Sequence, residues 1–273
     1  MKNRNNFIKF MFISGILLLI LFLITLFSLI KVFFIKEKMQ TKEIIEVNYK
    51  LDSVNILAFD FNHANVVFKT TNNEDLTIIQ NTKEEKLYLN INKYNNKITV
   101  DEDSILFNGN EKKYTIRIPK SYLGSIVITN GFGKINLYNL KSGLYIDNNA
   151  GEVNVFKSND INIKDVSGTL NLTDIEGNIV LSSSTGNINI KNVKGLLNID
   201  TLTGDIIVNN FKIEGNSKIE NISGDISLII NRDSICKIKA SNQSGESNID
   251  KSICSSKKNI LEVENITGNI NIK

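Results

Sequence analysis

Apolar and polar residues alternate from Gly124 onward in a repeated unit of nine residues that begins with glycine. The unit reads Gly-x-φ-x-φ-x-x-φ-x, where φ is an apolar residue. Five units follow one another without a gap, led by Gly168, Gly177, Gly186, Gly195 and Gly204. With small shifts the register continues upstream through Gly151, Ser142, Gly133 and Gly124, and downstream through Gly215, Gly224, Asn259 and Gly268. A fixed short period indicates a repeat architecture.

Positions +2 and +4 of each unit, counted from the glycine, alternate with polar residues, which predicts a strand with one buried face. The predicted inward set is Ile135, Leu137, Val153, Val155, Leu170, Leu172, Ile188, Ile190, Leu197, Ile199, Ile206 and Val208. Position +7 is expected to point inward again after a turn, as in Ile175, Val193, Leu202, Phe211 and Ile222. The leading glycine suits a corner with positive φ or close backbone approach.

One such unit cannot bury its own apolar face, so units must stack to form a core. An antiparallel sandwich or barrel also has short strands, but the constant spacing favours a β-solenoid. Two units per coil would give about 18 residues per turn, and a three-sided coil remains open. The predicted class is all-β, a β-solenoid over residues 121–273 preceded by one N-terminal transmembrane helix.

Residues 44–120 are strand-rich but less regular. Their apolar–polar alternation is interrupted by turn signals at Asn72-Asn73, Asn95-Asn96 and Asn108-Gly109. We interpret this part either as the first, irregular coils or as a strand cap over one end of the solenoid.

Residues 10–30 form an uncharged run rich in Leu, Ile and Phe. Its length suffices to cross a bilayer as a helix. A cleavable signal peptide is the main alternative, but the run is long and no small-x-small cleavage site follows. The sequence therefore predicts an uncleaved anchor, with a basic tail over residues 1–9 and a charged stalk over residues 31–43.

Lysine and arginine flank both sides of this run, so the positive-inside rule alone does not decide the orientation. The short basic tail nevertheless resembles the start of a signal anchor, and long downstream domains are translocated largely regardless of charge. We predict a single-pass protein of the cell membrane with a cytoplasmic N-terminus and an extracytoplasmic body.

The segment IRIPKSYLGSIVITNGFGKINLYNL, followed by GEVNVF and the GNINI units, resembles the DUF4097 proteins, also called "putative adhesins". The resemblance covers roughly residues 44–273, and its most specific part is the strand that ends in Pro119-Lys120. It implies an extracytoplasmic β-solenoid, often behind one membrane span and associated with envelope-stress systems of low-GC Gram-positive bacteria. The adhesin label implies binding without naming a ligand, and the family offers no catalytic motif to carry over.

The residues themselves predict no catalytic, cofactor-binding or metal-binding site. The net charge of +3 is too balanced to favour nucleic acid. His63 is the only histidine, which excludes a His-based triad or multi-His metal site within one chain. Asp101-Glu102-Asp103 lacks the spaced ligands of an EF-hand, so we interpret it as a solvated charge cluster. No phosphate loop, nucleophile elbow or basic–aromatic stripe is seen.

Carboxylates beside the turns raise the alternative of a glycan-cleaving enzyme, because some β-helices use carboxylates from stacked coils. Acidic turn residues are expected in any such repeat, however, and we expect no enzyme. The residues concerned are Asp165, Asp174, Asp200, Asp205 and Asp225.

Cys236 and Cys254 are 18 residues apart, so they could stack and form a disulfide outside the cell. The irregular register between them favours two buried free thiols. The last strand, 268–273, is expected to leave an open edge unless a cap covers it. The irregular stretch 229–258 could fold over that end, or a partner could add a strand.

The leading functional hypothesis is a non-enzymatic envelope scaffold or adhesin-like binding module that contacts a protein or wall polymer. The alternative is a self-associating structural β-helix that polymerises through its C-terminal edge.

Overall fold

The computed structural model describes residues 43–82, 87–103, 112–234, 236–250, 252–253 and 258–273. The chain divides into two units, residues 1–43 and 44–273, and the second is the body of the protein. The predicted span 10–30 lies outside the described residues. Among the residues that are described, no helix has the length and apolar character needed to cross a bilayer.

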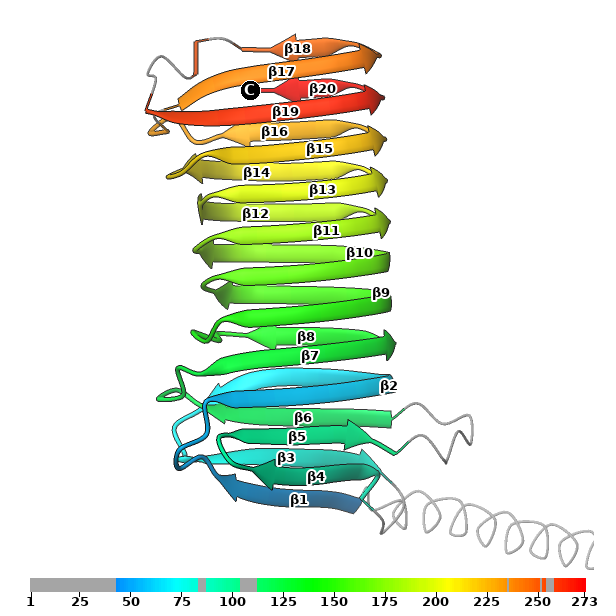
Figure 1. The fold of residues 1–273 in the computed structure, drawn as a ribbon, viewed down its shortest axis with the longest axis vertical. Coiled ribbons are helices and arrows are strands. Elements are labelled where there is room, and N and C mark those ends of the chain that lie inside the picture. Colours follow the sequence, from blue (N-terminus) through cyan, green and yellow to red (C-terminus); the bar gives the residue numbers. More distant parts are fainter. Residues whose placement is uncertain (1–42, 83–86, 104–111, 235, 251, 254–257) are drawn as a thin grey trace, which may run out of the picture. The chain divides into compact units, whose positions relative to one another are not determined.

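The described part of the body consists of strands joined by turns and loops, and the strands stack into one column of coils (Figure 1). They are β1 (Glu43–Lys50), β2 (Ile56–Thr71), β3 (Asp75–Thr82), β4 (Leu89–Tyr94), β5 (Lys97–Glu102), β6 (Lys112–Pro119), β7 (Ser125–Phe132), β8 (Lys134–Tyr138), β9 (Leu144–Ser158), β10 (Ile161–Glu176), β11 (Ile179–Thr185), β12 (Ile188–Gly195), β13 (Leu197–Thr203), β14 (Ile206–Ile213), β15 (Ser217–Ser223), β16 (Ile226–Ile230), β17 (Cys236–Ser244), β18 (Ser247–Ile249), β19 (Asn259–Thr267) and β20 (Ile270–Ile272).

Each regular coil contains two nine-residue units. Leu170 of β10 pairs in parallel with Ile188 of β12, and Ile188 pairs with Ile206 of β14, so in this part of the stack the repeat is 18 residues. The predicted all-β solenoid with two units per coil is therefore confirmed for the described residues, and a three-sided coil or antiparallel sandwich is excluded.

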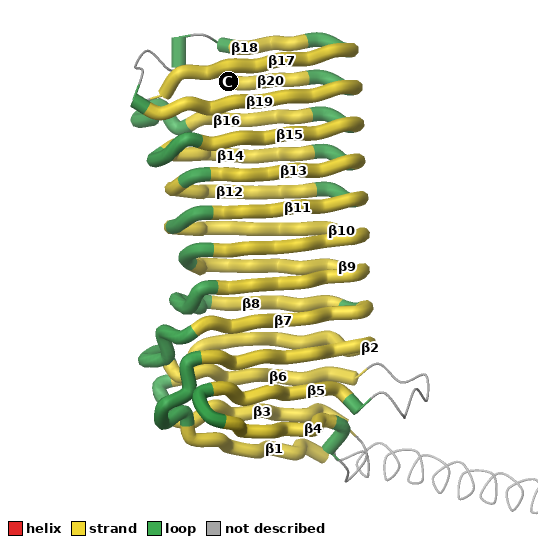
Figure 2. The backbone as a smooth tube through the Cα atoms, viewed as in Figure 1, coloured by secondary structure: helices red, strands yellow, loops and turns green. Residues whose placement is uncertain are grey.

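The chain reverses its direction at two corners in each coil, and the two corners differ (Figure 2). On one side the chain turns sharply through glycines, and on the other side it passes through loops. Gly186 shows why glycine is needed at the sharp corner. Its φ is +138°, and a Cβ there would collide with the carbonyl oxygen of Gly168 in the preceding coil. Any side chain at this position would push the coils apart.

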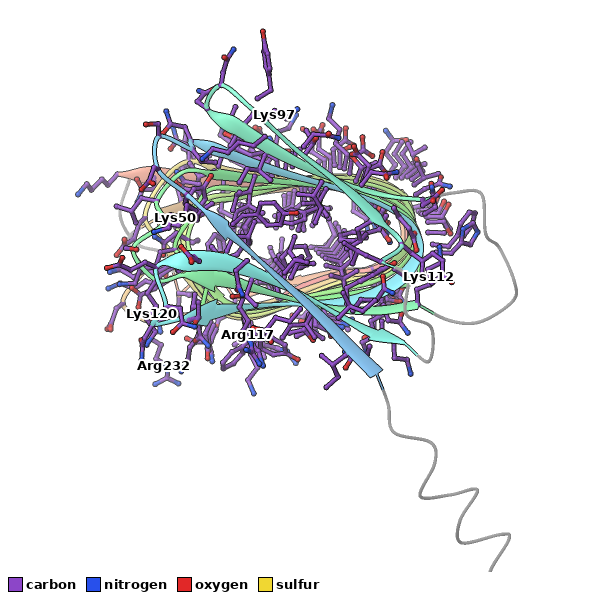
Figure 3. All side chains as sticks on the ribbon, turned by 90° about the horizontal axis from the view of Figure 1, so that it is seen from below. Lys50, Lys97, Lys112, Arg117, Lys120 and Arg232 are labelled. Carbon is purple, nitrogen blue, oxygen red and sulfur yellow. The ribbon has the colours of Figure 1, made fainter. Side chains whose placement is uncertain are left out.

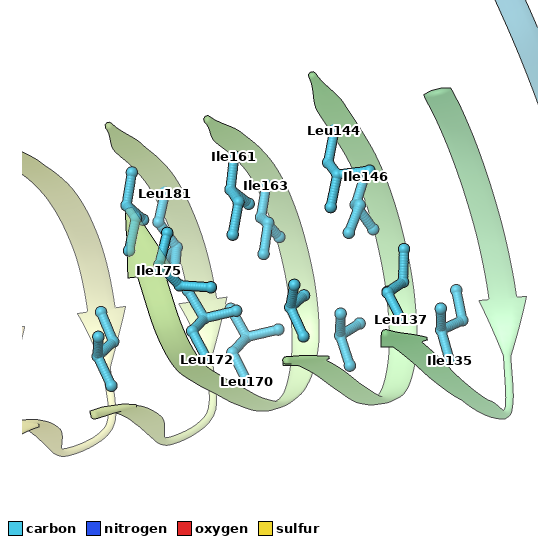
Figure 4. Close-up of a cluster of buried hydrophobic side chains, with 14 of the residues drawn as sticks. Ile135, Leu137, Leu144, Ile146, Ile161, Ile163, Leu170, Leu172, Ile175 and Leu181 are labelled. Carbon is cyan, nitrogen blue, oxygen red and sulfur yellow. The ribbon is translucent and has the colours of Figure 1, made fainter. Parts of the chain in front are cut away.

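The core lies between the two strand layers of each coil and runs along the column (Figure 4). All twelve residues predicted at positions +2 and +4 are buried. The prediction for position +7 is confirmed for Ile175, Val193 and Phe211 but wrong for Leu202 and Ile222, which are 48% and 46% exposed.

The reason is that alternate units are not equivalent. In the units of Gly168 and Gly186, the residue at +6 has positive φ (Asp174 and Asn192), and this turn directs +7 into the core. In the unit of Gly195, the strand stays extended up to the glycine corner. Strict alternation then buries Thr201 at +6 and exposes Leu202 at +7.

The N-terminal part combines both expected arrangements. The long strand β2 forms a coil that lies between β5–β6 on one side and β7–β8 on the other. β3 pairs antiparallel with β6, β4 pairs antiparallel with β5, and β1 pairs with β3. Residues 44–120 therefore supply irregular coils and an antiparallel cap. The expected turn at Asn95-Asn96 joins β4 to β5, whereas Asn108-Gly109 lies outside the described residues.

At the C-terminal end of the stack, the order of the coils in space differs from their order along the chain. β20 pairs with β16 on one side and with β18 on the other, and β19 lies likewise between β15 and β17. The last strand, β20, is therefore covered and is not an open edge. The alternative that the stretch 229–258 covers it is confirmed, because residues 236–249 form the outermost coil of the described part.

Cys236 begins this outermost coil and is fully buried. It takes part in a disulfide, so the favoured expectation of free thiols is wrong for this residue. Cys254 lies outside the described residues.

Candidate functional site

The looped side of the solenoid carries a column of residues in left-handed conformation. Their φ values lie between 53° and 60°, and they occupy position +6 of successive coils: Asn139, Lys157, Asp174, Asn192 and Asn210. Asn and Asp adopt this conformation at lower cost than other non-glycine residues, which explains why four of the five are of these types. The column therefore fixes one polar side chain per coil along this corner.

Hydrogen bonds between the coils link these side chains. Nδ2 of Asn192 donates to Oδ1 of Asp174 over 2.7 Å, and Nδ2 of Asn210 donates to Oδ1 of Asn192 over 3.0 Å. Asn231 continues the ladder by donating to Asn210 over 2.8 Å. Because each coil orients the amide of the next, the ladder presents groups of fixed orientation at intervals of about 4.8 Å.

A groove of about 590 Å³ runs along this column, and we name it the corner groove. The polar ladder lines it on one side. Buried side chains including Leu140, Ile175 and Val193 form its floor. The side chains at position +8 complete its lining: Lys141, Asn159, Glu176, Lys194 and Lys212. This is an elongated, mixed polar surface that suits an extended ligand more than a compact one.

A second hollow of about 550 Å³ adjoins the groove, since Asn139, Leu140 and Lys141 line both. Tyr122 lies at this end, where its hydroxyl donates to the carbonyl of Ser125 over 3.2 Å. Burial raises the pKa of Tyr122 to about 12, so this hydroxyl stays protonated at neutral pH. The second hollow extends the groove to Pro119 and Lys120 at the end of β6.

The turn carboxylates singled out in the sequence are distributed over the coils and do not form one centre. Asp174 accepts from Asn192 in the ladder. Asp205 accepts from the backbone N–H of Asp225 (2.9 Å), and Asp225 accepts from the backbone N–H of Asn269 (2.7 Å). These three therefore join adjacent coils, while Asp200 is exposed on β13. Among the described residues no group of His, Cys, Asp and Glu has a metal-binding arrangement.

Asp165 is buried and belongs to a second column that sequence reasoning missed. This column occupies position +6 of the other kind of unit and includes Asn130, Asn148, Asp165, Ser183, Thr201, Asn221 and Asn265. Asn148 and Ser183 donate to the two carboxylate oxygens of Asp165 over 2.7 and 3.0 Å. Burial raises the pKa of Asp165. The recurrence of polar residues at position +6 of alternate units could have predicted this column.

Glu102, expected to be part of a solvated cluster, is buried instead. Its Oε2 accepts hydrogen bonds from the backbone N–H groups of Asn62 (2.7 Å) and His63 (2.9 Å), at the corner of β2. Lys112 Nζ lies 3.3 Å from its other oxygen. Asp101 is exposed and Asp103 is half-buried, so the solvated interpretation is wrong for Glu102.

His63 is exposed at this corner and its ring stacks on Phe132, with ring centroids 5.0 Å apart. His63 therefore links the surface of β2 to that of β7.

The family model described as Toastrack DUF4097 matches residues 54–272. The chain belongs to the DUF4097 family. The match covers the coils, the corner groove and most of the N-terminal cap, and so confirms the resemblance seen in the sequence. The search of curated proteins found no match.

Solved structures of similar proteins include three with low sequence identity. One is described as a "putative cell adhesion protein" from Clostridium sporogenes, with 14% identity, 85% of this chain and 99% of that chain covered, and a TM-score of 0.30. A "putative adhesin" from Bacteroides fragilis is similar with 13% identity, 85% of this chain and 98% of that chain covered, and a TM-score of 0.43. A "putative adhesin" from Parabacteroides merdae is similar with 15% identity, 86% of this chain and 97% of that chain covered, and a TM-score of 0.32.

Proposed function

We propose that this DUF4097 protein is a non-enzymatic binding module of the cell envelope that holds an extended ligand in its corner groove. The observation that carries the proposal is the polar ladder along the groove. A ladder fixed by inter-coil hydrogen bonds is preorganised, so little side-chain entropy is lost when a ligand binds. Oδ1 of Asp174 accepts the hydrogen bond from Asn192, so this carboxylate forms part of the ladder.

The location forms part of the same proposal. A body displayed outside the membrane behind an anchor at residues 10–30 would place the groove next to wall polymers and envelope proteins. The support is the length and apolar character of that run, together with the basic residues before it.

Binding of the purified body, residues 44–273, to isolated cell envelopes tests the function. The body has its own continuous hydrophobic core, so it should fold without residues 1–43. We expect it to co-sediment with envelopes, and the double variant Lys141→Glu/Lys194→Glu to bind at least about tenfold more weakly, since both lysines line the groove. Lys164→Glu/Lys237→Glu makes the same charge change at exposed sites outside the groove and should bind normally. Equal binding by both double variants would contradict the groove as the site.

Protease treatment of protoplasts tests the location in the full chain. We expect protease added outside the protoplasts to degrade the body. A body that is fully protected until the membrane is permeabilised would contradict the extracytoplasmic location.

Self-association is a second candidate function, favoured by one observation. In the described part, β17 pairs only with β19 and β18 only with β20, so the outer side of this end coil is a sheet edge. Exposed Lys237 and Lys239 disfavour pairing of two such edges. Sedimentation of the body distinguishes the two functions, because self-association through this edge requires reversible oligomers at high concentration.

A further inference from the structure

Four strands bring basic and aromatic residues together on the outer face beside the corner groove. In the coil stack Arg117 of β6 pairs with Lys69 of β2, Lys69 pairs with Tyr138 of β8, and Tyr138 pairs with Phe156 of β9. We name these residues the basic–aromatic column. Their order along the chain differs from their order in space, so the sequence itself shows no basic–aromatic stripe.

The aromatic part of the column is accessible. Tyr138 is 39% exposed and Phe156 is partly exposed. Their ring centroids are 6.5 Å apart with an interplanar angle of 57°. Nζ of Lys157 lies 5.1 Å from the centroid of the Phe156 ring. Two adjacent rings, with a cation over one of them, form a platform for a flat, partly apolar group that carries negative charge.

The positive charge around these rings is not neutralised. Lys69, Lys120, Lys141 and Lys157 are exposed and Arg117 is partly exposed. Within the described residues none of the five forms an ion pair, whereas nearby Lys134 pairs with Glu152 at 2.7 Å. Lys120 and Lys141 line one hollow, and Lys141 and Lys157 line the next. Arg117 and Lys120 lie on the same side of the solenoid in Figure 3.

We propose that the basic–aromatic column and the adjoining end of the corner groove bind an anionic glycan, a polymer of sugar rings that carries carboxylate or phosphate groups. The C–H faces of sugar rings pack on Tyr138 and Phe156, while the anionic groups pair with the unneutralised cations. Coils that repeat every ~4.8 Å offer successive binding positions to a polymer. This inference rests on the proposed binding function and names the class of its ligand.

Binding of the purified body to defined polymers tests the inference separately from envelope binding. The probes are polygalacturonate (rings and carboxylates), polyphosphate (anions without rings), dextran (rings without charge) and a single-stranded oligonucleotide. We expect polygalacturonate to bind most tightly, with an affinity that falls as salt is raised. Tyr138→Ala/Phe156→Ala should weaken it about tenfold. Tyr145→Ala, which removes an exposed ring from β9 at a position outside the column, should leave it unchanged.

Thermal unfolding of each variant verifies that the fold is kept. Equal affinity for polyphosphate and polygalacturonate, tighter binding of the oligonucleotide, no effect of the double substitution, or no binding of polygalacturonate would each overturn the inference. A body that binds envelopes but not polygalacturonate would refute the ligand class and leave the proposed function standing.

Discussion

Asn192 donates from Nδ2 to Oδ1 of Asp174, one coil earlier, over 2.7 Å, and both residues have positive φ. The left-handed turn therefore has two roles, since it sends Val193 into the core and holds an amide in the groove. Replacing Asn192 by Ala should lower the free energy of unfolding by about 2–4 kcal/mol, because two hydrogen bonds are lost and Ala is strained at this φ.

Asn192→Gly is the matched control, since it loses the same hydrogen bonds but tolerates the conformation. Its free energy of unfolding, measured by chemical denaturation, should be roughly 1 kcal/mol higher than that of the alanine variant. If the two variants unfold alike, the left-handed conformation is not what the site requires.

Glu102 replaces a backbone acceptor at the corner of β2. In regular coils the corner N–H donates to a carbonyl of the next coil, as Gly186 does to Thr203 over 3.0 Å. Glu102→Ala removes the acceptor for Asn62 and His63 and the ion-pair partner of Lys112. It should destabilise the body by about 3–5 kcal/mol in denaturant titrations, and Glu102→Gln by less. A loss under about 0.5 kcal/mol for the alanine variant would refute this role.

Asp165 should make stability depend on pH. Because burial raises its folded-state pKa above the ordinary value of 3.8, the folded protein binds more protons than the unfolded one between these two values. The contribution of Asp165 to stability is therefore most favourable below the unfolded pKa and decreases as pH rises through the folded pKa. Asp165→Asn removes this decrease, so the unfolding temperature of the variant relative to the native protein should be higher at pH 7 than at pH 4. A difference that is constant between these pH values would contradict the prediction.

Substitutions at position +7 test whether the two kinds of unit alternate along the chain. Phe211 is fully buried, whereas Leu202 is 48% exposed at the same position of the preceding unit. Phe211→Ala should cost about 3–5 kcal/mol, while Leu202→Ala should change stability by less than about 0.5 kcal/mol. Similar losses at both positions would contradict the alternation.

These comparisons also indicate which parts of the structure could be predicted from sequence. The spacing of Ile188 and Ile190 was sufficient for the strands, the buried face and the coil, because period-two burial depends only on neighbouring residues. Leu202 was misplaced, since the turn that separates the two kinds of unit depends on the φ of a single Asn or Asp. The insertion of β2 and of β19–β20 between other coils could not be predicted, because strand pairing distant in sequence leaves no local pattern.

The same limit applies to the functional surface. The paired residues of the basic–aromatic column are 18 (Tyr138 and Phe156) to 69 (Lys69 and Tyr138) positions apart in the sequence and meet only through strand register. The Asn and Asp residues of the polar ladder recur at position +6 in the sequence, but their hydrogen bonds depend on the parallel stacking of coils.

Hydrogen–deuterium exchange of the body with and without isolated envelopes tests the central claim most directly, because it reports which corner of the solenoid the ligand covers. We predict slower exchange in the turns at residues 139–142, 157–160 and 174–177 on the groove side, with no change at the glycine corners 166–168 and 202–204. Protection confined to the glycine corners, or to the end coil 236–249, would contradict the corner groove as the binding surface.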